Sequence, residues 1–238
     1  MLLSQMNTGE PLMDVDKKST DGPDMQLSLR TPRAAALAGI LFSALLIASL
    51  LTLRLSVPAD PLEAGHWLAT STRQVGVALN LVPFAGVAFM WFIGVMRDRL
   101  GAREDQFFAT VFLSSGFLFL GMIFVAAAAM GALILAHAAQ PELIVDTGTF
   151  AFTRAFSFSI MHIYAFKMSA VFMVSASTLA IRTRITARWI AVLGYVSAAL
   201  LLLGSAYVEW LLFVFPGWVL LVSVDILMDN LRRASPSA

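Results

Sequence analysis

The amino-acid sequence predicts an all-α fold, namely a polytopic membrane protein built as a six-transmembrane-helix bundle. Hydrophobic residues make up 59% of the 238 residues and charged residues only 13%, whereas soluble domains average about 45–50% and about 25%. So little polar surface could not cover a globule in water. The apolar residues also gather in six segments, each long enough, at about 20 residues, to cross a hydrocarbon core of about 30 Å as a helix.

These segments define the predicted domain organisation. A polar N-terminal tail (residues 1–33) contains DVDKKSTDGPD and no apolar periodicity, so we expect it to be disordered. The transmembrane domain covers residues 34–230, and a short C-terminal tail covers residues 231–238. The six predicted spans are Ala34–Leu53, Val75–Met96, Phe107–Ala136, Ala155–Ile181, Trp189–Tyr207 and Trp210–Met228.

Cationic residues predict how the spans are oriented. Twelve of the 16 Lys and Arg residues fall in the two tails and in the connections after the second and fourth spans. Six crossings place all twelve on one side of the membrane, and the positive-inside rule makes that side, with both termini, cytoplasmic. The arginines expected on the other side are Arg54, Arg73 and Arg154.

The third predicted span, Phe107–Ala136, is rich in small residues. Glycine, alanine and serine let membrane helices approach closely, which is how they associate without a hydrophobic driving force. We therefore expect this span to be the central packing helix, and its composition also allows a homo-oligomer. The small residues are Ser114, Ser115, Gly116, Gly121, Gly131 and the run Ala126–Ala129.

The fourth predicted span carries Lys167 near its middle. The lysine is roughly 20 Å from either end of the span by helix rise, too far for its side chain to reach water. A central lysine costs about 2.5–3.5 kcal/mol to insert. We therefore expect Lys167 to face the bundle interior. There it would belong to a solute or proton site, or it would be a structural lysine bonded to carbonyls and hydroxyls of neighbouring helices.

Other polar residues of the same span extend the candidate pathway. His162 lies about 12 Å along the helix from Arg154, although a lone histidine in a helix bundle is more often a packing residue than a ligand. Tyr164 falls near Lys167 on a helical wheel. Arg154 marks the outer end of the pathway, where it could also pair with acidic residues of the outer connections.

Two further candidates lie on other spans. Asn80 precedes Pro83 in the second span, and together they could form a polar notch facing the fourth span or only an ordinary kink with an interhelical amide bond. Asp225 is the acid within the sixth span. It is a candidate counter-ion for Lys167, but pairing with the arginine segment Arg182–Arg188 is the simpler interpretation.

Several kinds of chemistry have no motif here. The chain has no cysteine, which excludes disulfides, thiolate metal sites and cysteine nucleophiles. P-loop, GxSxG, HExxH and dinucleotide-binding motifs are absent. A net charge of +1 leaves no electrostatic footprint for nucleic acid. The sequence therefore predicts no catalytic residue, cofactor or metal, and an enzyme is not expected.

Two stretches carry a resemblance. The run LVPFAGVAFMWFIGVMRDRLGAREDQFFATVFLSSGFLF, followed later by VFMVSASTLAIRTRITARWIAVLGY, resembles a family of uncharacterised bacterial multi-pass membrane proteins. The likeness covers most of the chain from about Val75 onward. It implies six helices in a bacterial cytoplasmic (inner) membrane, and it implies no activity.

Three functions are compatible with these features. The first is a small-solute transporter, or permease-like ligand-binding bundle, with a polar site around the fourth span. The second is a non-catalytic accessory or scaffold subunit of a larger membrane complex, and the third, ranked last, is an enzyme acting on a lipid. The expected partners are the bilayer, a small-molecule ligand, and a membrane protein or a second copy of the chain. A wet cavity around Lys167 would favour the first function, whereas a dry helix contact or the outer surface of the protein would favour the second.

Overall fold

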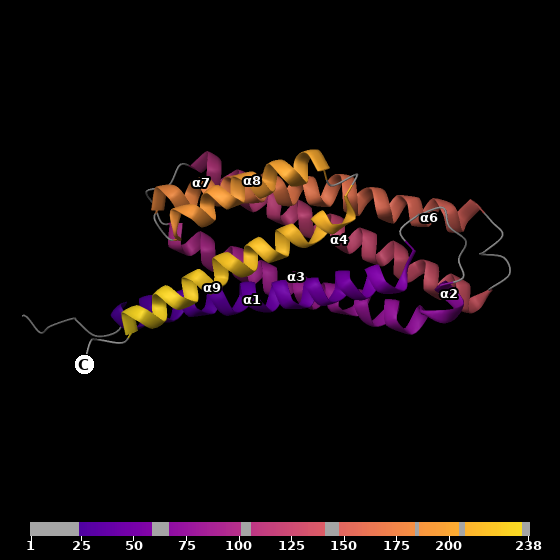
Figure 1. The fold of residues 1–238 in the computed structure, drawn as a ribbon. Helices are drawn as coiled ribbons and strands as arrows, with labels where there is room; N and C mark the ends of the chain where they lie inside the picture. The colour runs from indigo at the N-terminus through magenta and orange to yellow at the C-terminus, as the bar shows by residue number, and fades with distance from the viewer. Residues whose placement is uncertain are drawn as a thin grey trace, which may run out of the picture.

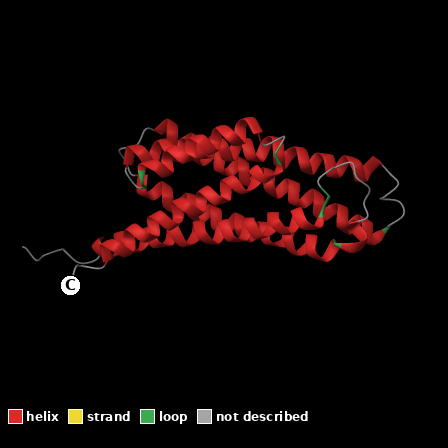
Figure 2. Ribbon diagram, viewed as in Figure 1, coloured by secondary structure: helices red, strands yellow, loops and turns green. Residues whose placement is uncertain are grey.

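A computed structural model of the protein describes residues 24–58, 67–100, 106–140, 148–183, 186–204 and 208–234. Every regular element in these ranges is a helix (Figure 2), so the all-α class is confirmed for the described chain. The elements are α1 (Asp24–Ser56), α2 (Trp67–Thr70), α3 (Thr72–Leu100), α4 (Gln106–Ala139), α6 (Gly148–Ser159), the π-helix η1 (Ile160–Ala165), α7 (Phe166–Thr183), α8 (Arg188–Gly204), the 3₁₀-helix η2 (Glu209–Phe213) and α9 (Val214–Ala234).

Five stretches of the described helices are long and apolar enough to cross a membrane. They are Arg33–Ser56, Thr72–Arg97, Phe107–Ala139, Gly148–Thr183 and Trp210–Arg232. The predicted count of six is not confirmed, because α8 is a shorter apolar helix of 17 residues. We expected this span to continue to Tyr207, but the helix ends at Gly204, and residues 205–207 lie outside the described chain.

The first helix extends beyond the first predicted span. Helix α1 begins at Asp24, ten residues before the predicted start at Ala34. Once a helix has formed, each added residue gains a backbone hydrogen bond, so α1 continues past its apolar part into the polar tail. Residues 1–23 of the predicted tail lie outside the described chain.

The long helices lie side by side along one axis, and α8 and α9 cover only part of their length (Figure 1). Helix α1 packs on α3 and α9, α7 packs on α4 and α8, and α6 packs on α4. The start of α1 and the end of α9 lie at the same end of the bundle, whereas α2 and the start of α6 lie at the opposite end. We call these the C-terminal end and the α2 end. Helices α8 and α9 meet part-way between them (Figure 1).

Phenylalanine rings form the centre of the main core. Phe89 of α3 is fully buried, and its ring centroid lies 4.5–6.2 Å from those of five other phenylalanines. They belong to α1, α3, α4, α7 and α9, so these rings join five helices. The neighbours are Phe42, Phe92, Phe119, Phe172 and Phe215.

The most buried helix is not the one that the small residues predicted. In its most apolar stretch, Phe107–Ala139 has 28% of its residues buried, the lowest value of the five spans, whereas Gly148–Thr183 has 61%. Helix α4 is therefore the least buried of the five spans, although it packs on α3, α6, η1 and α7. Its small residues allow α3 and α7 to approach on one side, as where Gly116 lies against Ile93 and Phe172, while its other side faces outward.

A second, smaller hydrophobic cluster lies toward the α2 end. Its buried members come from α2, α3, α4 and α6, and Leu53, Leu79 and Met130 pack against it. The members are Trp67, Leu68, Val75, Leu133 and Phe150. The two clusters leave an incompletely filled region between them, and the candidate site lies there.

Candidate functional site

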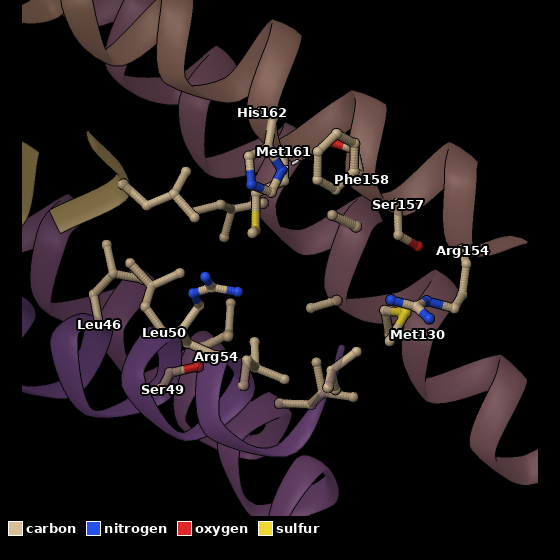
Figure 3. Close-up of a pocket in the computed structure, with 18 of the residues that line it drawn as sticks. Leu46, Ser49, Leu50, Arg54, Met130, Arg154, Ser157, Phe158, Met161 and His162 are labelled. Carbon is tan, nitrogen blue, oxygen red and sulfur yellow. Dashed lines mark hydrogen bonds between the residues drawn. The ribbon is translucent and has the colours of Figure 1, made fainter. Parts of the chain in front are cut away.

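A pocket of about 140 Å³ lies between the main core and the α2 cluster. Its walls come from α1, α3, α4, α6 and η1, and Leu212 of η2 also lines it. Most of the lining is aliphatic, but two arginines, two serines and a histidine also contribute (Figure 3). These polar residues are Ser49, Arg54, Arg154, Ser157 and His162.

Arg154 is held in place on the α6 wall. Its side chain is only 5% exposed. Its Nη2 donates a hydrogen bond of 2.8 Å to the carbonyl oxygen of Pro58, and its Cζ lies 5.9 Å from the centroid of the Trp67 ring. A cation over the face of an indole ring is stabilised by the ring quadrupole. These contacts orient the guanidinium at the α2 end of the pocket.

Arg54 approaches from the opposite wall. It lies in the last turn of α1, is partly buried, and reaches into the pocket (Figure 3). Its Cζ lies 5.8 Å from the centroid of the Trp210 ring, which belongs to η2. A guanidinium therefore lies over an indole ring on both walls, and the two arginines face one pocket from helices about 100 residues apart in the chain.

His162 lies in η1, where the fourth span changes from α-helical to π-helical winding. The side chain is 6% exposed. Its Nδ1 is 3.1 Å from the Phe158 carbonyl oxygen, and its ring stacks on that of Phe158 with centroids 3.9 Å apart. Single π turns within α-helices often occur at functional sites. Here the π turn and the pocket coincide.

The two serines of the pocket differ in how their hydroxyls are used. Ser49 donates a hydrogen bond of 2.8 Å to the Ala78 carbonyl oxygen and so joins α1 to α3. Ser157 is 5% exposed, and its Oγ has no hydrogen-bond partner among the described residues. Ser223, by contrast, donates to the carbonyl four residues earlier, whereas Ser177 is also buried without a partner in the described chain. The Ser157 hydroxyl therefore lies at the pocket wall without a partner among the described residues.

The structure brings together two of the six residues that the sequence predicted. Arg154 and His162 line the pocket, whereas Lys167 and Tyr164 do not belong to its described lining. Lys167 is partly buried, and within the described chain it makes no hydrogen bond or ion pair. Tyr164 is 55% exposed.

Asn80 and Asp225 also lie away from the pocket. The Asn80 side chain is exposed, and its Nδ2 donates to the Gly76 carbonyl oxygen of the same helix at 2.9 Å. It lines a separate pocket of about 480 Å³ between α3 and α4. Asp225 Oδ2 accepts a hydrogen bond of 3.1 Å from the Ala187 backbone N–H, directly before α8. A carboxylate is favourable at a helix N-terminus, so Asp225 anchors the start of α8.

Sequence reasoning missed Arg54, Ser49 and Ser157 as site residues. The charge distribution could have identified Arg54, because it is one of the few arginines predicted on the side of the membrane that is poor in cationic residues. The two serines have no such signal, since nothing in the sequence distinguishes them from the serines that bond within their own helix. The outer acidic residues Asp60, Glu63, Glu142 and Asp146 lie outside the described residues.

Comparison with known proteins adds no further constraint. No protein-family model, curated protein or solved structure matches the chain. Among the described residues, no three His, Asp or Glu side chains lie close enough together to hold a metal ion. The function therefore has to be inferred from the pocket and the surfaces of this bundle.

Proposed function

We propose that the protein is a multi-pass membrane protein, permease-like in architecture, that binds a small molecule in the pocket between Arg54 and Arg154. The observation that carries this proposal is the polar content of an otherwise apolar pocket inside a membrane bundle. Ligand pockets are mostly apolar and have a few polar groups that fix the orientation of the ligand. In this pocket two guanidiniums and His162 come from three different helical elements.

Helix lengths support a position for the pocket at the outer membrane surface. Arg54 is 21 residues from Arg33, and His162 is 20 residues from Arg182. Both separations correspond to about 30 Å of helix, the thickness of a hydrocarbon core. With the C-terminal end at the cytoplasmic surface, as the positive-inside rule requires, the pocket lies at the other surface of a bacterial cytoplasmic membrane.

The same lengths give Lys167 a different role from the one its sequence position suggested. The span Gly148–Thr183 has 36 residues, or about 54 Å of helix, so its midpoint is not the middle of the bilayer. Lys167 then lies about 8 Å below the level of His162, close enough to the surface for a lysine to extend its ammonium group toward it. Ligand binding in the pocket therefore does not depend on Lys167.

A second candidate function has its own observation. Tyr164 is exposed and Lys167 is partly exposed on the fourth span, outside the pocket, and polar groups at such positions favour contact with another protein. An accessory subunit of a larger membrane complex would use this surface, and a homo-oligomer would use it equally.

Native mass spectrometry of protein extracted gently from its own membrane tests the first function against the second. We expect the wild-type protein to carry a stoichiometric small molecule that Arg154→Gln loses. Arg73→Gln is the matched control, because Arg73 is an exposed arginine toward the α2 end that does not line the pocket. A stoichiometric protein partner together with an empty pocket would contradict ligand binding and support the accessory subunit.

A further inference from the structure

The geometry of the pocket points to one class of ligand, and we infer that it is an anionic amphiphile. Such a molecule has a phosphate or carboxylate head group and at least one alkyl chain, and it reaches the pocket from the surrounding bilayer. This inference rests on the proposed function, because it identifies the ligand of the same pocket.

The head group is specified by the charged lining. The two charged side chains among the described lining residues are both arginines. A guanidinium is a planar fork of N–H donors that matches phosphate and carboxylate oxygens and remains charged at any physiological pH. Ser157, whose buried hydroxyl has no other partner in the described chain, lies one helical turn from Arg154 and adds a neutral donor. This donor set favours an anion over a cation or a neutral sugar.

The alkyl chain is specified by the aliphatic majority of the lining. Leu46, Leu50 and Leu212 line the pocket next to the main core. A ligand that fits this lining and also pairs with a guanidinium must have an apolar part and an anionic part, as an amphiphile has.

The size of the pocket limits how much of an amphiphile it can enclose. An apolar cavity of about 150 Å³ holds a benzene-sized molecule, and the pocket here has about 140 Å³. It can therefore enclose only part of a lipid, such as the linkage region and the first carbons of a chain. The rest of the ligand must extend out of the pocket.

The bundle provides a path for that extension. The pocket lies between α1 and α6 (Figure 3), while α6 packs on α4 and α1 packs on α3 and α9. An alkyl chain that leaves the pocket between α1 and α6 would enter the surrounding lipid.

Lipid titration of the detergent-purified full chain, followed by native mass spectrometry, tests the inference. The probes are phosphatidylglycerol, palmitate, phosphatidylcholine and inorganic phosphate. We expect phosphatidylglycerol or palmitate to bind at one molecule per chain. Arg54→Gln should weaken this binding about ten- to a hundredfold, as for a lost hydrogen bond to a charged group. Arg73→Gln should leave it unchanged.

A second variant tests binding in the pocket without changing the charge of its lining. Ser157→Leu should also weaken phosphatidylglycerol binding, because it removes a donor and fills the pocket while both arginines remain. Circular dichroism and size-exclusion chromatography establish that each variant is folded. Binding that Arg54→Gln leaves unchanged would identify lipid bound only to the outer surface and overturn the inference.

The remaining outcomes show whether the ligand class alone is wrong or whether the proposed function also fails. If phosphatidylcholine binds as tightly as phosphatidylglycerol, or inorganic phosphate binds as tightly as either anionic amphiphile, the ligand class is wrong although the pocket still binds a small molecule. If no probe binds in the pocket and no small molecule co-purifies with the native protein, the proposed function fails as well.

Discussion

The main core and the pocket are adjacent regions of one bundle, yet they are built from opposite kinds of side chain. Phe89 and its five ring neighbours are held by close contact between rings, whereas Arg54 and Arg154 are each held at the edge of a pocket over an indole ring. Van der Waals packing and small residues hold membrane helices together, while buried cations cost free energy. The comparison assigns the stability of the bundle to the core, and under the proposed function it assigns ligand binding to the pocket.

The largest expected effect is a loss of stability from a substitution in the main core, which leaves the side chains of the pocket unchanged. Phe89→Ala removes a fully buried ring that contacts four other helices, and such truncations cost about 3–5 kcal/mol. Unfolding of the detergent-solubilised protein in sodium dodecyl sulfate measures the loss. Phe84→Ala is the control, because Phe84 is 66% exposed on the same helix and its loss should change stability little. Equal losses in the two variants would show that the ring cluster is not the core.

A smaller effect tests close packing away from the pocket. Gly194→Ala would place a Cβ 2.1 Å from Ser177 Oγ and 2.9 Å from Trp218 Nε1. Overpacking of this kind costs about 1–3 kcal/mol, so the melting temperature should fall. A Cβ at Gly94 meets nothing within 4 Å, and Gly94→Ala should therefore be neutral or stabilising. A Gly194→Ala protein that melts no lower than Gly94→Ala would contradict the tight α7–α8–α9 contact.

A substitution within the pocket should lower ligand affinity and leave the stability of the fold almost unchanged. Ser157→Ala removes the hydroxyl that has no partner among the described residues, so the free energy of unfolding should stay within about 0.5 kcal/mol. Affinity for an anionic amphiphile should fall several-fold, as expected for about 1 kcal/mol from one hydrogen bond. Ser49→Ala is the comparison, since it breaks the bond to Ala78 and should lower stability. If Ser157→Ala destabilises the fold as much as Ser49→Ala, its hydroxyl has a structural role.

The smallest expected effect concerns Lys167. Lys167→Met replaces a partly buried cation, which has no hydrogen-bond or ion-pair partner in the described chain, by an apolar side chain of similar length. Pocket binding should be unchanged and stability unchanged or slightly higher, by titration and thermal unfolding. Co-purification of a partner protein that the variant loses would instead assign Lys167 to an interaction surface.

Some features of the candidate site could be predicted from the sequence. Arg154 and His162 stand out because an ionisable residue in an apolar run is costly wherever the run lies. The relative positions of residues along the fourth span could not be predicted from a helical wheel. A wheel assumes an uninterrupted α-helix, and η1 changes the winding between Arg154 and Lys167. The face on which Lys167 lies relative to Arg154 is therefore shifted.

The sequence by itself determined that the chain is helical and that at least five of its helices are long and apolar enough to cross a membrane. Those properties depend on local composition, because lipid leaves the backbone no hydrogen-bond partner outside the helix. Only the tertiary structure decided that α4 is the least buried of the five spans, that α8 ends after 17 residues, and that Arg54 faces the same pocket as Arg154. Lipid is as apolar as the core, so hydrophobicity does not reveal which side of a membrane helix packs inward. The shape of the contacting surfaces decides it.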